Sequence, residues 1–126
     1  MKYFDIQELV PQYIYARYMH AADWFIDPRL GVVLDELREQ VGHPVYVNTG
    51  KHDQRGFRTA DSEHYSPTSQ HSFGRAADCS ADWDVHRVRE LIQFGEIQFS
   101  YPVSIEDGVS WLHIDVRNQP RPVYVF

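Results

Sequence analysis

The sequence predicts a single α+β domain, residues 1–126, with helices packed on one face of a small, mostly antiparallel sheet. Two segments, 28–41 and 85–94, have apolar residues at helical spacing and a capping residue directly before them. Shorter stretches of extended character lie between and after these segments. A chain of 126 residues, 43% of them hydrophobic, is long enough to bury one core.

The N-terminal part is predicted to be helical. Asp5 is an N-cap with Glu8 three residues later, which is a capping box. Pro11 ends or restarts this helix, because proline has no amide hydrogen. The dense apolar positions from Tyr13 to Phe25 predict a second helix.

A third and clearer helix begins at Asp27-Pro28, a cap followed by proline in the first turn, and ends at Gly42. Its apolar positions recur at helical spacing and are Leu30, Val33, Leu34, Leu37 and Val41. Such a stripe is typical of a helix that packs on a core.

The rest of the chain alternates between strands and loops. Pro44–Thr49 and Ala76–Ser80 are predicted strands, separated by a long polar loop from Lys51 to Pro67. A loop of this length inside a compact domain is usually functional. Val109–Val116 and Pro122–Phe126 are expected to form an antiparallel pair.

The remaining segments connect these elements. Asp84 caps a further helix that Gly95 ends, and Ile97–Ile105 is predicted to be extended. The sequence Glu106-Asp107-Gly108 predicts a turn before the last strands.

Composition excludes several classes of protein. The net charge of −6 argues against a nucleic-acid partner, which requires clustered Lys and Arg. The single cysteine, Cys79, excludes an internal disulfide and has no evident partner base, so we expect it to be buried. No segment is apolar enough to span a bilayer, and we expect a monomer.

The N-terminus lacks an apolar run of signal-peptide length, which predicts synthesis in the cytoplasm without a signal peptide. If the target is the cell wall, the protein would act after release by another factor, such as a holin, or as a virion component.

Three residues from two separated regions are candidate metal ligands. Imidazole and carboxylate suit a divalent metal such as Zn²⁺, and a catalytic zinc site uses three protein ligands and leaves one position open. His71 and Asp78 can supply two ligands from one loop and strand, and His113 a third from another strand. The alternative is a satisfied polar cluster without metal.

These residues belong to two motifs. The first comprises Ser69, His71, Gly74, Ala76 or Ala77, and Asp78, and the second comprises Trp111, His113 and Asp115. Upstream lie Val47-Asn48-Thr49-Gly50 and Gly56-Phe57-Arg58. The whole pattern, over about residues 44 to 117, resembles the zinc D-Ala-D-Ala carboxypeptidases and the phage L-alanyl-D-glutamate endopeptidases, whose hedgehog/DD-peptidase fold also occurs in the N-terminal domain of sonic hedgehog.

The resemblance implies roles for individual residues. His71, Asp78 and His113 would bind Zn²⁺, and Arg58 would face the metal and contact a carbonyl or carboxylate of the substrate. Arg58 suits either task through its forked donors. An ordinary solvated arginine is the alternative.

Three further residues are expected around the metal. Ser69 would donate to a ligand or to its backbone. Asp115 would orient His113 or anchor a neighbouring loop. Trp111 shares a strand face with His113 and would either flank the groove or lie in the core.

The general base is where the chain departs from the best-known branch of the family. Many of the resembling peptidases have Glu three residues before the second His, and Ser110 occupies that position here. The nearest carboxylates are Glu106 and Asp107, which are candidate catalytic groups or an ordinary acidic turn. Asp107 is the marginal preference, because hedgehog's glutamate also lies six residues before its second His ligand.

The functional prediction is a zinc metallopeptidase that hydrolyses peptidoglycan stem peptides, encoded by a phage or prophage, as endolysins are. Whether it is a carboxypeptidase or an endopeptidase does not follow from these residues. The alternative is a binding or virion-structural module that keeps the fold and metal without turnover, as hedgehog illustrates. Ser110 favours this alternative, whereas Arg58 and the three ligands favour the enzyme.

Overall fold

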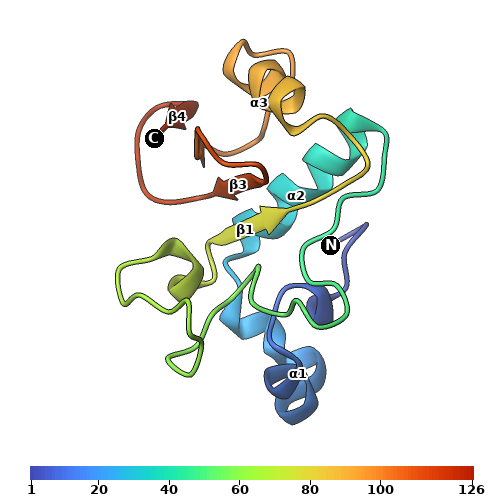
Figure 1. Cartoon of the computed structure of the whole chain (residues 1–126), viewed down its shortest axis with the longest axis vertical. Coiled ribbons are helices and arrows are strands. Elements are labelled where there is room, and N and C mark those ends of the chain that lie inside the picture. Colours follow the sequence, from blue (N-terminus) through green and yellow to red (C-terminus); the bar gives the residue numbers. More distant parts are fainter.

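Three α-helices and a four-stranded mixed sheet make up the protein in the computed structural model, which describes residues 1–126 (Figure 1). The helices are α1 (Gln12–Tyr18), α2 (Pro28–Val41) and α3 (Val85–Gln93). The strands are β1 (Ala76–Cys79), β2 (Val103–Ile105), β3 (Leu112–Asp115) and β4 (Val123–Val125). Three 3₁₀ segments, η1 (Ile6–Glu8), η2 (Met19–Phe25) and η3 (Gln70–Phe73), complete the structure. The predicted α+β class is confirmed.

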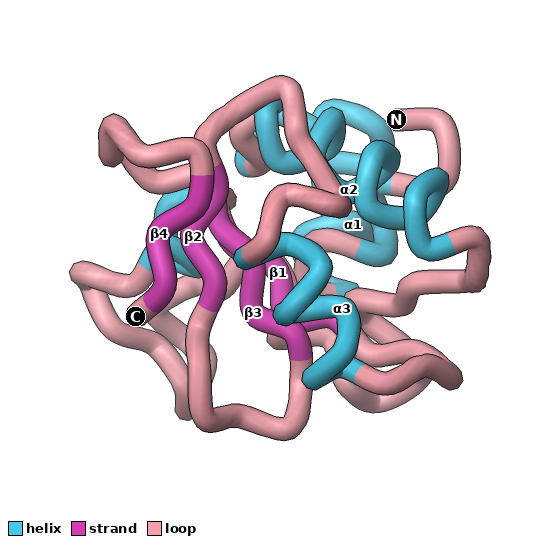
Figure 2. The backbone as a smooth tube through the Cα atoms, turned by 90° about the horizontal axis from the view of Figure 1, so that it is seen from above, coloured by secondary structure: helices cyan, strands magenta, loops and turns pink.

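The strands lie side by side in the order β1-β3-β2-β4 (Figure 2). β3 pairs antiparallel with both β1 and β2, but β4 pairs parallel with β2. The predicted antiparallel pair of Val109–Val116 with Pro122–Phe126 is therefore wrong. The physical reason is that β2 already occupies the second edge of β3, so residues 116–122 carry the chain past β2 before it re-enters the sheet.

The predicted strand at Pro44–Thr49 is also wrong. This segment forms only isolated bridges, such as Tyr46 with Ser80. Val45 and Val47 are buried nevertheless. The alternation of apolar residues in this segment therefore arises because these two side chains pack on the core, although the segment is not a strand of the sheet. Of the extended segment 97–105, only β2 is a strand.

The helix ends follow the predicted capping chemistry. Asp5 and Glu8 form the capping box, and Asp27 accepts a hydrogen bond from the amide of Arg29 at the start of α2. The single helix predicted from Tyr13 to Phe25 is wrong. It breaks at Met19, whose φ of 51° is incompatible with an α-helix, and continues as η2.

One face of the sheet packs against the helices, and α2 lies behind β1 in Figure 1. The core joins apolar side chains of the sheet to those of α2 and α3: Ala77, Cys79, Leu112, Ile114, Leu30, Leu34, Leu37, Val88 and Ile92. Because side chains alternate along a strand, the polar residues between them point to the opposite face. Burial raises the pKa of the Cys79 thiol, consistent with an inert core residue.

Gly74 joins the η3 segment to the start of α2. Its φ is 66°, its carbonyl accepts a hydrogen bond from Asp27 at 2.9 Å, and a Cβ there would lie 1.8 Å from the carbonyl oxygen of Phe25. No residue other than glycine fits this position without moving the backbone.

We expect Gly74→Ala to destabilise the protein more than Gly42→Ala. Gly42 has a similar φ of 72°, but a Cβ added there would have no atom within 4 Å. Its substitution should therefore cost only the strain of a left-handed alanine, about 1 kcal/mol of unfolding free energy. The added contact at Gly74 should cost roughly 1–3 kcal/mol more. Urea unfolding of both variants measures the difference, and equal losses would contradict it.

Candidate metal centre

Three side chains that lie far apart in the sequence meet on the open face of the sheet. His71 comes from η3, and Asp78 and His113 lie directly opposite each other on β1 and β3. One ligand atom from each residue lies within 4.8 Å of the others, so the cluster can hold a metal ion. Both imidazole side chains are buried, with 4% and 8% of their surface exposed.

Hydrogen bonds outside the cluster fix the ring orientation of both histidines. Nδ1 of His71 donates to the carbonyl of Gly56 at 2.9 Å, which leaves Nε2 facing Asp78 Oδ1 at 3.3 Å. His113 is turned the other way: its Nε2 lies 2.8 Å from Asp115 Oδ2 and its Nδ1 lies 2.9 Å from Asp78 Oδ1. Each ring therefore presents one nitrogen to the cluster and has an acceptor on the other, the usual arrangement of metal-binding histidines.

The local chain explains why His71 is placed so accurately. Ser69 caps η3, and its hydroxyl accepts a hydrogen bond from the amide of His71 at 3.3 Å. Ser69 thus supports the backbone of His71 as a hydrogen-bond acceptor, whereas the expectation was that its hydroxyl would donate. Gly74 then turns the chain into β1, which carries Asp78.

Asp115 is fully buried behind His113 and is itself held by an arginine absent from the predicted site. Nε and Nη2 of Arg117 donate to its two carboxylate oxygens at 2.9 and 2.6 Å. The guanidinium also lies over the ring of Phe126 at 4.3 Å, and this ring meets His113 edge-on at 5.5 Å. The spacing Asp115-x-Arg117 could have predicted this contact, because residues two apart along an extended chain share a face.

Each carboxylate of this network pairs directly with His113 and with an arginine. Burial opposes the charged form of His113, but hydrogen bonds to Asp115 and Asp78 outweigh it and raise the pKa of His113 to about 9. Burial also opposes ionisation of Asp78, yet hydrogen bonds from His113 and His71 keep the pKa of Asp78 well below its usual range. Against burial, Arg117 and His113 likewise lower the pKa of Asp115. A metal bound at His113 would therefore displace a proton from it at neutral pH.

We expect the chelator-treated protein to lose stability between about pH 6.5 and pH 9. The pKa of His113 is raised from 6.5 to about 9 on folding, so its contribution is complete below the lower value and lost as the pH rises through the upper one. A bound metal competes with this proton, so the stabilisation by added zinc should grow over the same interval. Melting temperatures with and without chelator at pH 6, 7.5 and 9 test this, and a constant difference would contradict it.

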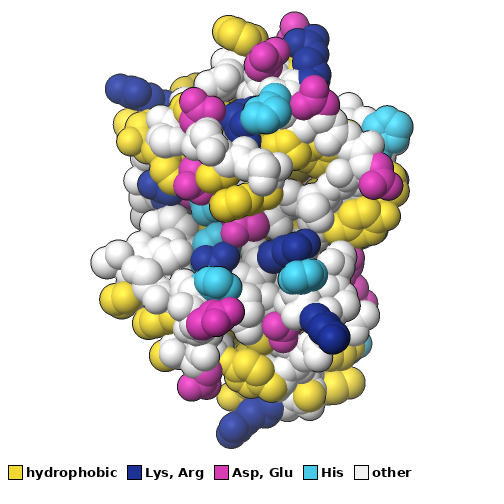
Figure 3. Space-filling model, in the orientation of Figure 1, with side chains coloured by type: hydrophobic (Ala, Val, Ile, Leu, Met, Phe, Trp, Pro, Cys, Tyr) yellow, Lys and Arg dark blue, Asp and Glu magenta, His cyan; other side chains and the backbone are white.

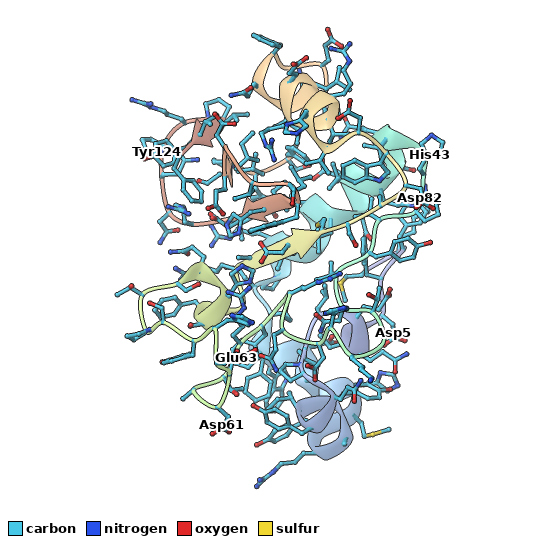
Figure 4. All side chains as sticks on the ribbon, in the orientation of Figure 1. Asp5, His43, Asp61, Glu63, Asp82 and Tyr124 are labelled. Carbon is cyan, nitrogen blue, oxygen red and sulfur yellow. The ribbon has the colours of Figure 1, made fainter.

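Arg58 reaches the cluster from the long loop. Its Nη2 donates to Asp78 Oδ2 at 3.0 Å, and its Nε donates to the carbonyl of Gln54 at 2.6 Å. Arg58 thus faces the candidate ligands, and it binds the carboxylate oxygen that lies away from the histidines. The sequence did not predict the hydrogen bond between Arg58 and Asp78, because this bond depends on the path of residues 51–67 across β1. Figure 4 shows the loop of Asp61 and Glu63 below β1 and Tyr124 of β4 above it.

The cluster forms the floor of an open cavity of about 510 Å³. Its lining residues come from the loop, η3 and the four strands with their flanks: Arg58, His64, Thr68, Ser69, Gln70, His71, Asp78, Glu106, Trp111, His113, Arg117 and Phe126. Trp111 is 42% exposed and lies at the cavity wall, not in the core.

The two candidate bases differ in position. Glu106 lines the cavity, whereas Asp107 does not, and the carboxylate of Asp107 accepts a hydrogen bond from the amide of Gly108 at 2.9 Å. The structure therefore places Glu106, and not the marginally preferred Asp107, in the lining of the cavity that contains the candidate ligands.

Arg89 is a second residue that the sequence did not reveal. It is buried on α3 and donates from Nη2 to the carbonyls of Val109 and Trp111 at 2.8 and 3.0 Å. These bonds hold the segment that leads into β3, and so support both Trp111 and the following ligand strand.

No family model matches the chain, and no curated protein or solved structure is significantly similar to it. The likeness of the two motifs to the zinc peptidases therefore stays a prediction. None of the helices has the length and apolar character needed to cross a membrane.

Proposed function

We propose that this protein is a zinc peptidase that hydrolyses peptidoglycan stem peptides. The observation that carries the proposal is the convergence of His71, Asp78 and His113 at the floor of an open cavity, with the outer nitrogen of each imidazole already hydrogen bonded. Two imidazoles and one carboxylate fit a catalytic zinc, which keeps one coordination position for water or substrate. The substrate class comes from the motif resemblance.

The cavity supplies the remaining groups that peptide hydrolysis needs. A zinc ion, when bound, would act as a Lewis acid toward water and the scissile carbonyl. Arg58 uses Nε and Nη2 within the protein, so Nη1 is the atom that would donate to the developing oxyanion or to a substrate carboxylate. The Glu106 carboxylate would accept a proton from the attacking water and return it to the leaving nitrogen.

The test is hydrolysis of a stem pentapeptide, L-Ala-γ-D-Glu-L-Lys-D-Ala-D-Ala, by the zinc-loaded protein with and without chelator. This peptide contains both bonds that the motif resemblance suggests, so the products show which one is cleaved. Chelator should stop the reaction and zinc should restore it. Absence of cleavage in zinc-loaded protein would refute the proposal.

A metal-bearing binding module is the second candidate, and one observation favours it. The only acidic side chains that line the cavity are Asp78 and Glu106, because Ser110 replaces the expected Glu. If Glu106 is not a base, the only other carboxylate of the cavity is that of the candidate ligand Asp78. The pentapeptide would then bind without being cleaved.

We expect Arg58→Lys to reduce kcat/KM for the pentapeptide by about 10- to 100-fold, because lysine keeps the charge but loses the forked donors. Zinc content should be unchanged, since Arg58 contacts the outer oxygen of Asp78 and no ligand atom that faces the histidines. The matched control is Arg87→Lys on α3, whose side chain is 60% exposed and pairs only with Glu90. Loss of zinc from Arg58→Lys would show that Arg58 serves the metal centre and not the substrate.

A further inference from the structure

A second hollow of about 370 Å³ adjoins the metal cavity. Both cavities are lined by Arg58, His64 and Trp111, so together they form one groove. The other lining residues of the second hollow are Lys51, His52, Asp53, Gln54, Arg55 and Glu63. In Figure 3, Lys or Arg and His side chains lie near the centre of the visible face, with acidic side chains among them.

The arginines of this groove differ in what neutralises them. Arg58 forms an ion pair with Asp78, and Arg117 forms one with Asp115. Arg55 forms no ion pair; its side chain donates only to the hydroxyl of Ser80 at 3.5 Å, the limit of a hydrogen bond. A half-buried guanidinium without a carboxylate is a ready partner for an anionic ligand.

Lys51, Asp53 and Glu63 line the hollow beside Arg55, and none of them forms an ion pair with it. Lys51 also forms no ion pair, and Asp53 is occupied by hydrogen bonds from the amide of Gln12 and the side chain of Gln54. Glu63 is 85% exposed and lies beside His64. Neither carboxylate forms an ion pair with Arg55, so its guanidinium keeps its donors for an anionic ligand.

The backbone of Arg55 is fixed relative to the metal centre. Its amide donates to the side chain of Asn48 at 3.0 Å, and its carbonyl accepts a hydrogen bond from the amide of the ligand Asp78 at 2.8 Å. An anion held by Arg55 would therefore lie at a defined distance from the candidate metal, which is what a substrate-positioning group requires.

We propose that Arg55, assisted by Lys51, binds a free carboxylate of the substrate and makes the site selective for acidic stem peptides. This inference rests on the proposed function for the identity of the peptide. The stem pentapeptide offers two such groups, the α-carboxylate of D-Glu and the terminal carboxylate of D-Ala, and amidation of each in turn distinguishes them.

The experiment compares the pentapeptide with two amidated forms, one carrying D-isoglutamine in place of D-Glu and one carrying a C-terminal amide. Binding to the full chain is measured by calorimetry after chelator treatment, so that it does not depend on turnover, and hydrolysis is measured with zinc. Amidation of the carboxylate that Arg55 binds should weaken affinity by about 10- to 100-fold. Arg55→Gln should weaken the unmodified peptide by the same factor and abolish the difference between acid and amide.

The matched control, Arg87→Gln, should leave every affinity unchanged. Equal binding of all three peptides to the wild type, or an acid preference that survives Arg55→Gln, would overturn the subsite. The two proposals fail separately: acid-selective binding without cleavage removes the peptidase and keeps the subsite, whereas cleavage without acid selectivity does the reverse.

Discussion

His113→Ala is expected to abolish stoichiometric zinc binding and the stabilisation that zinc confers. The substitution removes the only ligand contributed by β3, and leaves Asp78 and His71 to hold the ion alone. Loss of a supporting hydrogen bond costs about 10- to 100-fold in metal affinity, so loss of a ligand should cost more. His71→Ala should have the same effect, because it removes the other imidazole ligand atom, Nε2, which faces Asp78. Elemental analysis and melting temperatures with added zinc measure both.

The matched control for these variants is His64→Ala. His64 lines the same cavity, but its side chain is 61% exposed and it is not part of the three-residue cluster. It should retain zinc at one ion per chain. Equal zinc in wild type, His71→Ala and His113→Ala would remove the assignment, and loss of zinc from His64→Ala would extend it.

We expect His113→Ala to fold without metal. In His113→Ala, Asp78 and Asp115 lose the imidazole that lies between them and helps to lower both of their pKa values. Both carboxylates keep an arginine, Arg58 and Arg117 respectively. The variant should therefore fold, so its zinc content is measurable.

The candidate ligands were predicted through the resemblance of the two motifs to those of the zinc peptidases, and local patterns account for the position of each ligand on its own element. Strand alternation places Asp78 and His113 away from the core, and the cap and turn around η3 place His71. The helix ends were equally predictable, since capping at Asp27 and Gly42 depends on adjacent residues alone. In these elements, local chemistry and the final fold agree.

What could not be predicted depends on contacts between distant segments. β4 pairs parallel with β2 because the outer edge of β2 is free, whereas both edges of β3 are occupied. The residues Val123–Val125 themselves do not indicate which strand they will pair with. Arg89 is similar: an arginine on an amphipathic helix is usually solvated, and only the fold shows that it reaches the carbonyls of Val109 and Trp111.

Glu106→Gln is expected to lower the rate of pentapeptide hydrolysis by about 100- to 10,000-fold without changing zinc content. Along an extended chain Glu106 would be too far from His113, but β2 and β3 are antiparallel neighbours with Ile105 opposite Ile114. Continuing this register by one position sets Glu106 opposite His113, and alternation turns it to the same face.

Asp107→Asn is the matched control for this substitution, because it neutralises the adjacent carboxylate, which lies outside the cavity and accepts a hydrogen bond from Gly108. Its rate should equal that of the wild type. An unchanged rate in Glu106→Gln would exclude that residue as the base. A wild type that binds zinc but cleaves nothing, together with activity gained by Ser110→Glu, would instead identify a metal-bearing binding module, since the missing carboxylate would then be the one obstacle to turnover.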